Sequence, residues 1–546
     1  MKLITSRLIL LLLIFTSLNF AQKKNSKYRM LYNSDGTDIL GNYYYGSKPI
    51  TIDEVKSYVD RVVNTPVTTF LICSGALGPY HKSMYDRAFG DGEDERLIKR
   101  LSERPEDSLQ RKMMKVYNTN FKILNDLGTD IVEICVNRAK EKGKEAFISV
   151  RMNDLHFTDT GEYFPSTKSE FWLNHPEYWM GDHPGWHASG AFNFAHKEVR
   201  DYKLNLIKEE CEKYNIDGIE LDFMRFFVLF PFEKGKEYLD VMTNWIKQIR
   251  KEINTIATKK KKKILLSIRV APDVELCLNK GLDLKKWIKL NLIDFITAAP
   301  HWICDPNMPI MKFKRDLGNP DIPFYATLDD GQFQPREFRS HGIYRGVAAN
   351  YYSQGIDGLY FFNFFFTEKS LKELDSLKNI DSTFYVTIKY PELLSEMASL
   401  NSLKNKNKIY SLSDGSQETS YHHNSPFPIF VSAWEEYKVK LNIPEDFSDS
   451  KPEMILLFVR GTKNSNFLVK LNGKILSPAN SDLANLYRRN ANLLPDDEVY
   501  VFLIPYNYVK YGENDFNFRS IQPKPFFLKR MEVSVKFGNV KFFGYF

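Results

Sequence analysis

Eight short apolar runs, each followed by a stretch with helical periodicity, constrain the fold of this chain most strongly. The runs are rich in Ile, Val, Leu and Phe, which is typical of parallel strands buried on both faces. Eight such units predict a closed (β/α)8 TIM barrel rather than an open doubly wound sheet. No glycine-rich phosphate-binding motif follows the early runs, which argues against a nucleotide-binding fold. The predicted strands are Tyr28–Tyr32, Val67–Cys73, Ala146–Met152, Gly218–Met224, Ile264–Val270, Asp294–Ala299, Pro323–Leu328 and Gly358–Asn363.

Beyond residue 380 the pattern changes to short β-rich runs separated by turns. Asn472-Gly473 directly follows an apolar run, which is typical of a hairpin. We therefore expect an α/β barrel over residues 22–380, followed by an all-β, jelly-roll-like sandwich over residues 381–546. The polar stretch Asn401–Ser416 is expected to be an exposed loop. The predicted strands are Phe384–Tyr390, Phe427–Ala433, Met454–Arg460, Phe467–Leu471, Val499–Ile504 and Val533–Phe537.

The first 21 residues have the pattern of an export signal. Lys2 and Arg7 precede the apolar run Leu8–Phe15, and Ala21 is a plausible cleavage position. The run is too short to cross a bilayer, and no other segment is long and apolar enough to do so. Cleavage would lower the formal net charge from +7 to +5. We expect a periplasmic or secreted protein without a transmembrane segment, and the small net charge argues against nucleic-acid binding.

Five cysteines in an exported chain of 546 residues do not make a disulfide framework. No CxxC pair occurs, so neither a structural zinc site nor a thioredoxin-type motif is predicted. We expect buried free thiols, because free cysteine packs as a small hydrophobic residue.

The fourth predicted strand carries the strongest local signal for a site. In a TIM barrel the active site lies at the carboxyl ends of the strands. Alternation along this strand places Glu220 and Asp222 toward the barrel axis and their neighbours toward the helices. Two inward carboxylates on a buried strand are costly unless they are paired or used. Asp222, nearer the rim, is the better catalytic candidate, with a structural or substrate-binding carboxylate as the alternative.

Each neighbouring strand contains Ser-x-Arg followed by an aspartate, with the same parity. We infer that Arg151 and Arg269 point inward beside Glu220, which would lower its pKa and keep it ionised. Alternatively, an Arg–Glu–Arg network fixes the strand register and takes no part in the chemistry.

Polar residues at the other strand ends add candidates. Asp329 or Asp330 could supply a second carboxylate, as could Asp273, although adjacent aspartates at a strand end also cap helices and turns. His301 beside Trp302 would suit hydrogen bonding to a sugar and stacking on its ring, or His301 could be a satisfied core residue. The residues expected to position a substrate are Arg151, Asn153, His156, Arg225, Arg269, His301, Trp302 and Asn363.

A long insertion follows the third strand, at about residues 154–196. It contains five of the ten histidines and three tryptophans. A loop of this length is usually functional, and we expect a lid that lays Trp and His beside a sugar. No metal-binding pattern occurs in it, so neither a metal nor another cofactor is predicted. The run Lys259–Lys263 precedes the fifth strand and is expected to be a solvated turn on the opposite face.

The barrel resembles the bacterial glycoside-hydrolase-10-like family. The resemblance covers about two-thirds of the chain, and the motif Asp217-Gly-Ile-Glu-Leu-Asp222 is its most specific part. It implies a secreted carbohydrate-active enzyme with Asp222 as an active-site carboxylate. Family-10 xylanases place glutamates at strands four and seven, whereas strand seven here ends in Asp329-Asp330. The xylanase mechanism therefore cannot simply be transferred. The other motifs are Leu173–Trp179, Asn193–Tyr202 and Gly355–Asn363.

Together these features predict an exported glycoside hydrolase that acts on a polysaccharide or oligosaccharide. A glycosidase needs two carboxyl groups. Asp222 would be one, Asp329 or Asp273 the other, and Glu220 a supporting charge. One alternative is a carbohydrate-binding barrel without activity. Another is a lyase acting on a uronic-acid polymer, for which His156 and Arg225 are available.

Overall fold

The computed structural model describes residues 28–41, 49–89, 108–156, 158, 168–185, 188–300, 304–330, 340–364, 390–413, 426–486 and 493–538. The expected export signal, the predicted strand at 384–390 except its last residue, and the candidates His301 and Trp302 lie outside these residues. The predicted domain boundary near residue 380 also lies outside them.

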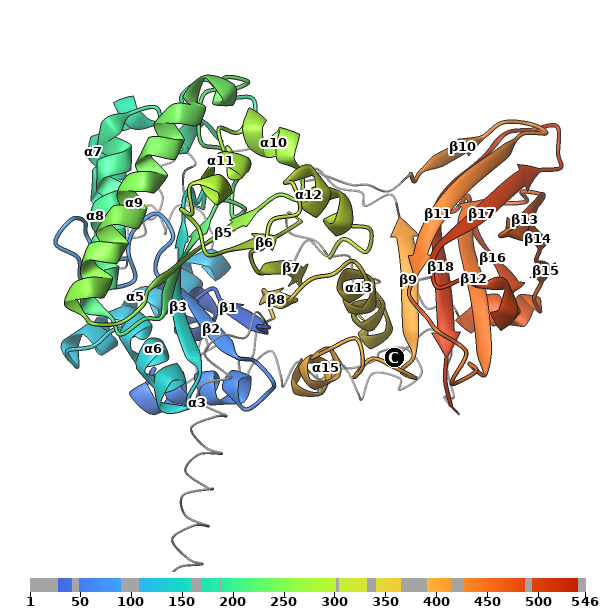
Figure 1. The fold of residues 1–546 in the computed structure, drawn as a ribbon, viewed down its shortest axis with the longest axis horizontal. Coiled ribbons are helices and arrows are strands. Elements are labelled where there is room, and N and C mark those ends of the chain that lie inside the picture. The colour runs from blue at the N-terminus through green and yellow to red at the C-terminus, as the bar shows by residue number, and fades with distance from the viewer. Residues whose placement is uncertain are drawn as a thin grey trace, which may run out of the picture.

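A closed barrel of eight parallel strands, in sequence order, forms the first part of the molecule (Figure 1). All eight predicted strands are present, which confirms the TIM barrel. The first strand begins three residues later than predicted and ends at Ser34. The strands are β1 (Leu31–Ser34), β2 (Thr69–Cys73), β3 (Glu145–Arg151), β4 (Gly218–Asp222), β5 (Leu265–Val270), β6 (Phe295–Ala298), β7 (Phe324–Asp329) and β8 (Gly358–Phe362).

Helices cover the outside of the barrel. The start of α3 shows how the sequence sets such boundaries: Thr51 Oγ1 accepts from the Glu54 backbone, and Glu54 accepts in return from Thr51. The helices of this part are α2 (Thr37–Leu40), α3 (Ile52–Val63), α5 (Ser108–Asp126), α6 (Ile131–Glu141), α7 (Glu170–Asn174), α8 (Lys197–Lys213), α9 (Leu239–Lys259), α10 (Val274–Asn279), α11 (Leu284–Lys289), α12 (Ile310–Asp316) and α13 (His341–Ser353).

The inside of the barrel changes character along its axis. At the amino ends of the strands it is filled by an apolar cluster that includes Phe147, Phe295 and Tyr325. Phe147 occupies space that a larger residue at position 218 would need, because a Cβ on Gly218 would lie 2.2 Å from its ring. Toward the carboxyl ends the inward positions of the same strands become polar and then charged.

The second part is a β-sandwich of two antiparallel sheets, with the strand orders β10-β18-β12-β16-β15, where β9 also pairs with β18, and β11-β17-β13-β14. Rings from the two sheets meet in its core, as Phe467 does with Phe502 at 5.9 Å. The strands are β9 (Lys408–Ser413), β10 (Ile429–Val431), β11 (Glu436–Ile443), β12 (Met454–Thr462), β13 (Phe467–Leu471), β14 (Lys474–Ile475), β15 (Ser477–Pro478), β16 (Asp497–Leu503), β17 (Gly512–Ser520) and β18 (Phe526–Lys536).

The prediction of an exposed loop at Asn401–Ser416 is wrong, because this segment contains the buried strand β9. This strand lies between β18 and helix α13. The backbones approach so closely that a Cβ on Gly346 would lie 2.1 Å from the carbonyl oxygen of Ile409. The polar residues of this segment led to the prediction of a loop. One of them, Lys408, can be buried because Glu445 pairs with it at 2.9 Å.

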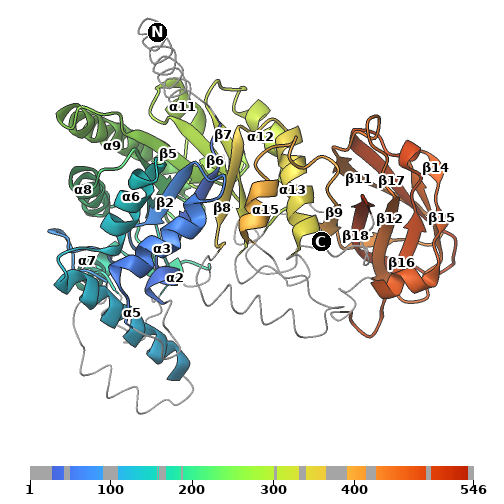
Figure 2. The same cartoon turned by 90° about the horizontal axis from the view of Figure 1, so that it is seen from below.

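Helix α13 joins the two parts of the molecule, and both views place it, with α15 (Tyr390–Glu396), between the barrel and the sandwich (Figures 1 and 2). Arg345 of α13 pairs with Glu396 of α15 at 2.7 Å. Asn442 of the sandwich donates to Ser353 of α13 at 3.0 Å. These contacts fix the sandwich against one side of the barrel.

All five cysteines are buried free thiols, as expected. In the described ranges, no helix combines the length and the apolar character that a membrane crossing requires.

Candidate functional site

Two strand-end carboxylates share one arginine at the carboxyl end of the barrel. Arg269 of β5 contacts both oxygens of Asp222 on β4, at 3.0 and 3.1 Å, through Nη1. Its Nη2 lies 4.0 Å from Oδ2 of Asp329 on β7. The guanidinium also stacks 4.0 Å from the ring centre of Phe362 on β8. Four strands therefore hold two carboxylates in a fixed relation around one cation.

Glu220 lies one inward position deeper than Asp222 and is fully buried. It accepts hydrogen bonds from Ser149 Oγ at 2.8 Å and from Tyr360 OH at 2.7 Å. Burial, and then the negative charge of Asp222, raise the pKa of Glu220 to about 7. The expectation that cations keep it ionised is therefore wrong, and Glu220 can carry a proton near neutral pH.

Arg151 is not beside Glu220 as expected. Its guanidinium pairs with Asp154 at 2.6 Å and with Asp35, the residue after β1. Burial and the nearby Arg225 lower the pKa of Arg151 to about 10, so that it stays charged near neutral pH. Because Arg151 turns toward the rim, Arg269 is the arginine beside Asp222, and the Arg–Glu–Arg network does not form.

A second polar group, above the carboxylates, centres on Asp154. His156 Nδ1 lies 2.5 Å from Asp154 Oδ1, and Arg225 Nη2 lies 3.1 Å from His156 Nε2. Burial raises the pKa of Asp154, but His156, Arg151 and Arg225 outweigh it and hold that pKa well below its usual range. Burial lowers the pKa of His156. A neutral imidazole that donates from Nδ1 to Asp154 and accepts from Arg225 at Nε2 fits this geometry.

Other predicted residues have supporting roles. The Asn153 amide binds backbone groups at Phe192 and Val228, so it fastens two loops. Asn363 adopts a left-handed backbone (φ 62°) and donates to Asp329 at 2.9 Å, which orients that carboxylate. Asp273 caps α10 by accepting from the Leu276 backbone at 2.8 Å. Of the three candidates for a second carboxylate, the structure brings Asp329 to Asp222. Asp330 accepts a hydrogen bond from Tyr344 OH, and Asp273 serves as a helix cap.

The insertion after β3 packs much of its aromatic content on itself. Trp172 is buried and stacks on Trp179 with ring centres 4.0 Å apart. Both indole nitrogens donate to backbone carbonyls of the insertion. These two rings therefore stabilise the insertion, whereas Trp186 and His187 lie outside the described residues. Over the described ranges, no three His, Cys, Asp or Glu side chains gather in a way that could hold a metal ion.

Sequence reasoning missed three residues of the site: Asp35, Tyr360 and Phe362. The predicted first strand ended at Tyr32, so Asp35, which follows the true end of β1, was not considered a strand-end residue. Tyr360 and Phe362 share the inward parity of the eighth strand. The same alternation that identified Glu220 could have found them.

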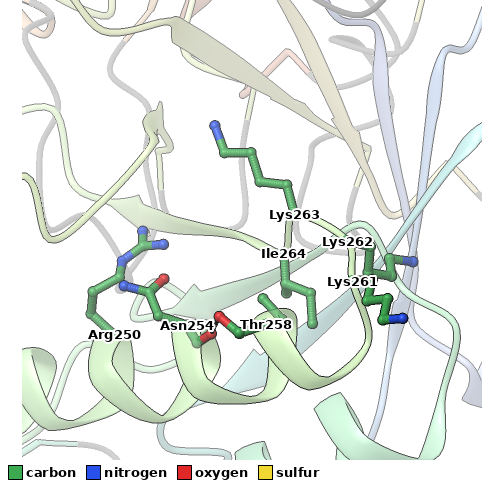
Figure 3. Close-up of a pocket in the computed structure, with 8 residues that line it drawn as sticks. Arg250, Asn254, Thr258, Lys261, Lys262, Lys263 and Ile264 are labelled. Atoms are coloured by element: carbon green, nitrogen blue, oxygen red, sulfur yellow. Dashed lines mark hydrogen bonds between the residues drawn. The ribbon is translucent and has the colours of Figure 1, made fainter.

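The lysine run before β5 borders an open pocket of about 330 Å³ (Figure 3). The pocket lies at the amino ends of the strands, opposite the carboxylates. Lys262 lies 3.6 Å from Asp217, and Lys263 lies 3.6 Å from Asp294. The run also follows the carboxyl end of α9, where cations are favoured. The expected solvated turn is confirmed.

Comparison with known proteins gives structural matches only. No protein-family model matches the chain, and no curated protein sequence does. A maltogenic alpha-amylase from Thermotoga neapolitana aligns over 92% of this chain and 99% of its own, with 12% identity and a TM-score of 0.38. The PgaB glycoside hydrolase domain from Bordetella bronchiseptica aligns over 68% and 99%, with 11% identity and a TM-score of 0.37. An alpha-L-fucosidase from Paenibacillus thiaminolyticus aligns over 92% and 98%, with 12% identity and a TM-score of 0.34.

These three proteins are glycoside hydrolases. The barrel assignment rests on the strand pairing of the chain itself.

Proposed function

We propose that the barrel is a glycoside hydrolase that cleaves glycosidic bonds in a polysaccharide or oligosaccharide, with Asp222 and Asp329 as its carboxyl pair. The observation that carries the proposal is the single guanidinium between them. Because Arg269 contacts Asp222 at 3.0 Å and lies 4.0 Å from Asp329, oxygens of the two carboxyl groups lie within about 9 Å of each other. Glycosidases of either stereochemistry use carboxyl groups within this range.

The two carboxyl groups have different surroundings, which suggests different roles. Asp222 is ion-paired with Arg269, which suits a base or a nucleophile. Asp329 lies farther from that cation, which suits the proton donor better than Asp222 does. Asn363 orients its carboxyl group. Glu220 lies one inward position deeper and gains or loses a proton near pH 7, so its charge next to Asp222 changes in this pH range.

A carbohydrate-binding barrel without activity is the second candidate. It is favoured by the burial of the pair, since Asp222 is 1% exposed and Asp329 is fully buried.

The test is a panel of polysaccharides and oligosaccharides incubated with residues 22–546, with products identified by mass. Hydrolysis gives two products whose masses add up to the mass of the substrate plus one water. Binding by calorimetry without any product would favour the binding protein. Absorbance from an unsaturated uronate would instead show a lyase and overturn the proposal.

Export is proposed as well, on the strength of the first 21 residues. Expression of the full chain in a bacterial host should yield a periplasmic or secreted protein whose amino terminus, read by mass, is Gln22. A protein that keeps Met1 and remains in the cytoplasm would contradict export.

A further inference from the structure

An open groove of about 660 Å³ lies on the rim of the barrel, between the loop Lys82–Ala88 and helix α7. We propose that this groove is an outer subsite for an uncharged glycan chain that extends from the carboxylates. The inference rests on the proposed function for its substrate class. The volume falls within the range of small-molecule sites. The residues that carry the argument are Lys82, Met84, Tyr85, Glu170, Phe171 and Asn174.

The groove lies at the end of the barrel where the carboxylates are. The loop follows β2, and α7 belongs to the insertion after β3, so both walls leave the carboxyl ends of neighbouring strands. β3 also provides Arg151 at the second polar group. Helix α7 lies on the side of the barrel away from the sandwich in both views (Figures 1 and 2). A chain leaving the carboxylates in this direction would not meet the sandwich.

The loop is held by carboxylates at two points. Glu209 of α8 accepts from Ser83 Oγ at 2.6 Å and from the Met84 backbone at 2.8 Å. Burial raises the pKa of Glu209, but hydrogen bonds from His81, Ser83 and Met84 outweigh it and keep that pKa below its usual value. Asp86 accepts from the Glu170 backbone at 2.8 Å, which ties the loop to α7. A loop fixed in this way loses little conformational entropy when a ligand binds.

The fixed loop presents apolar side chains to solvent. Met84 is 81% exposed and Tyr85 is 41% exposed. Across the groove Phe171 is held in place by stacking on Tyr202, with ring centres 4.3 Å apart. Met84, Tyr85 and Phe171 line the same groove, so together they give it an apolar floor that a ligand can contact.

The polar lining indicates what would bind. Lys82 and Asn174 are exposed beside the apolar side chains and can bond hydroxyl groups. The charged lining residues balance, with Lys82 and Arg87 against Asp86 and Glu170. A sugar ring presents C–H groups on its face and hydroxyls around its edge, which matches an aromatic and thioether floor with a polar border. Balanced charge favours a neutral sugar over a uronate or a sulfated one.

The test is the double variant Met84→Ala/Tyr85→Ala on the polymer that the protein cleaves and on the shortest oligosaccharide it cleaves. We expect KM on the polymer to rise about tenfold with kcat within about twofold, and neither value to change on the short substrate. Tyr511→Ala, a 60% exposed ring on the sandwich, is the matched control and should change nothing. A polymer KM within about twofold of the unaltered protein would overturn the inference.

A direct binding measurement separates this inference from the proposed function. Cellohexaose, maltohexaose and mannohexaose are titrated into the protein carrying Asp222→Asn, with and without the two loop substitutions. Binding that weakens about tenfold with the loop substitutions supports the subsite even if no glycan is cleaved. Binding that the loop substitutions leave unchanged, or no binding of any of the three, overturns it.

Discussion

The two ends of the barrel interior are built from the same strands and have opposite chemistry. At the amino ends, Phe147, Phe295 and Tyr325 fill the space with rings, 5.1 to 5.9 Å apart. At the carboxyl ends, Asp222, Arg269 and the neighbouring carboxylates are equally buried but are held by charge. Apolar packing stabilises a fold directly, whereas a buried ion pair is weak evidence for stability. The amino end therefore stabilises the barrel, whereas the charges at the carboxyl end are available for binding or chemistry.

Removing the shared cation should have the largest effect. Arg269→Met leaves Asp222 and Asp329 buried without the positive charge between them, which should cost about 3–5 kcal/mol of unfolding free energy near pH 7 and abolish activity. Urea unfolding and product formation measure both. The cost should shrink near pH 4, where the carboxyl groups can protonate. A loss below about 1 kcal/mol would mean that the carboxyl end does not depend on this pair.

Truncating a ring at the amino end should affect stability alone. Phe147→Ala removes a fully buried side chain and should lower the unfolding free energy by about 3–5 kcal/mol, with kcat unchanged for the folded protein. Phe527→Ala, which truncates a 44% exposed ring of the sandwich, is the control and should stay within about 0.5 kcal/mol. If Phe147→Ala lowered kcat more than tenfold while the protein stayed folded, the division between the ends would fail.

Glu220 lies between the two ends and should make stability depend on pH. Its pKa is raised to about 7 when folded, so the folded state holds a proton that the unfolded chain has released. The stability that this raised pKa contributes is fully present below the pKa of glutamate in the unfolded chain. It is lost as the pH rises toward 7, which lowers the free energy of unfolding by on the order of 1–3 kcal/mol. Denaturant midpoints from pH 4.5 to 7.5 measure it. Glu220→Gln should flatten that slope, and an unchanged slope in this variant would contradict the raised pKa.

We expect the smallest effect on activity and stability from a substitution on the outer surface near the amino ends of the strands. Lys261 lines the open pocket there and is exposed. Lys261→Ala should change neither kcat nor the unfolding free energy by more than about 0.5 kcal/mol, because it is a surface substitution. A tenfold loss of activity in this variant would show that the amino end takes part in function.

Alternation along the strands accounts for what the sequence could predict. It identified the barrel, the inward direction of Glu220 and Asp222, and Arg269 as an inward arginine. Alternation could not predict which carboxylate pairs with each arginine, because Arg151 and Arg269 occupy equivalent positions on their strands. Only the folded structure shows that Asp35 pairs with Arg151 and Asp222 with Arg269. Nor could alternation find β9, whose polar residues are buried by contacts from β18 and α13.

A comparison of Asp222 with Asp273 tests whether the carboxylates around Arg269 form the active site. The sequence predicts both as catalytic candidates because both lie at or just beyond the end of a strand. Only Asp222 shares an arginine with Asp329, whereas Asp273 caps a helix. The measurement is kcat of Asp222→Asn and Asp273→Asn on the glycan that the unaltered protein cleaves. Asn remains a good helix cap, so Asp273→Asn should keep kcat within about twofold. Asp222→Asn should lower kcat by about 10²–10⁴-fold. A loss of less than about tenfold would show that Asp222 is not a catalytic carboxylate.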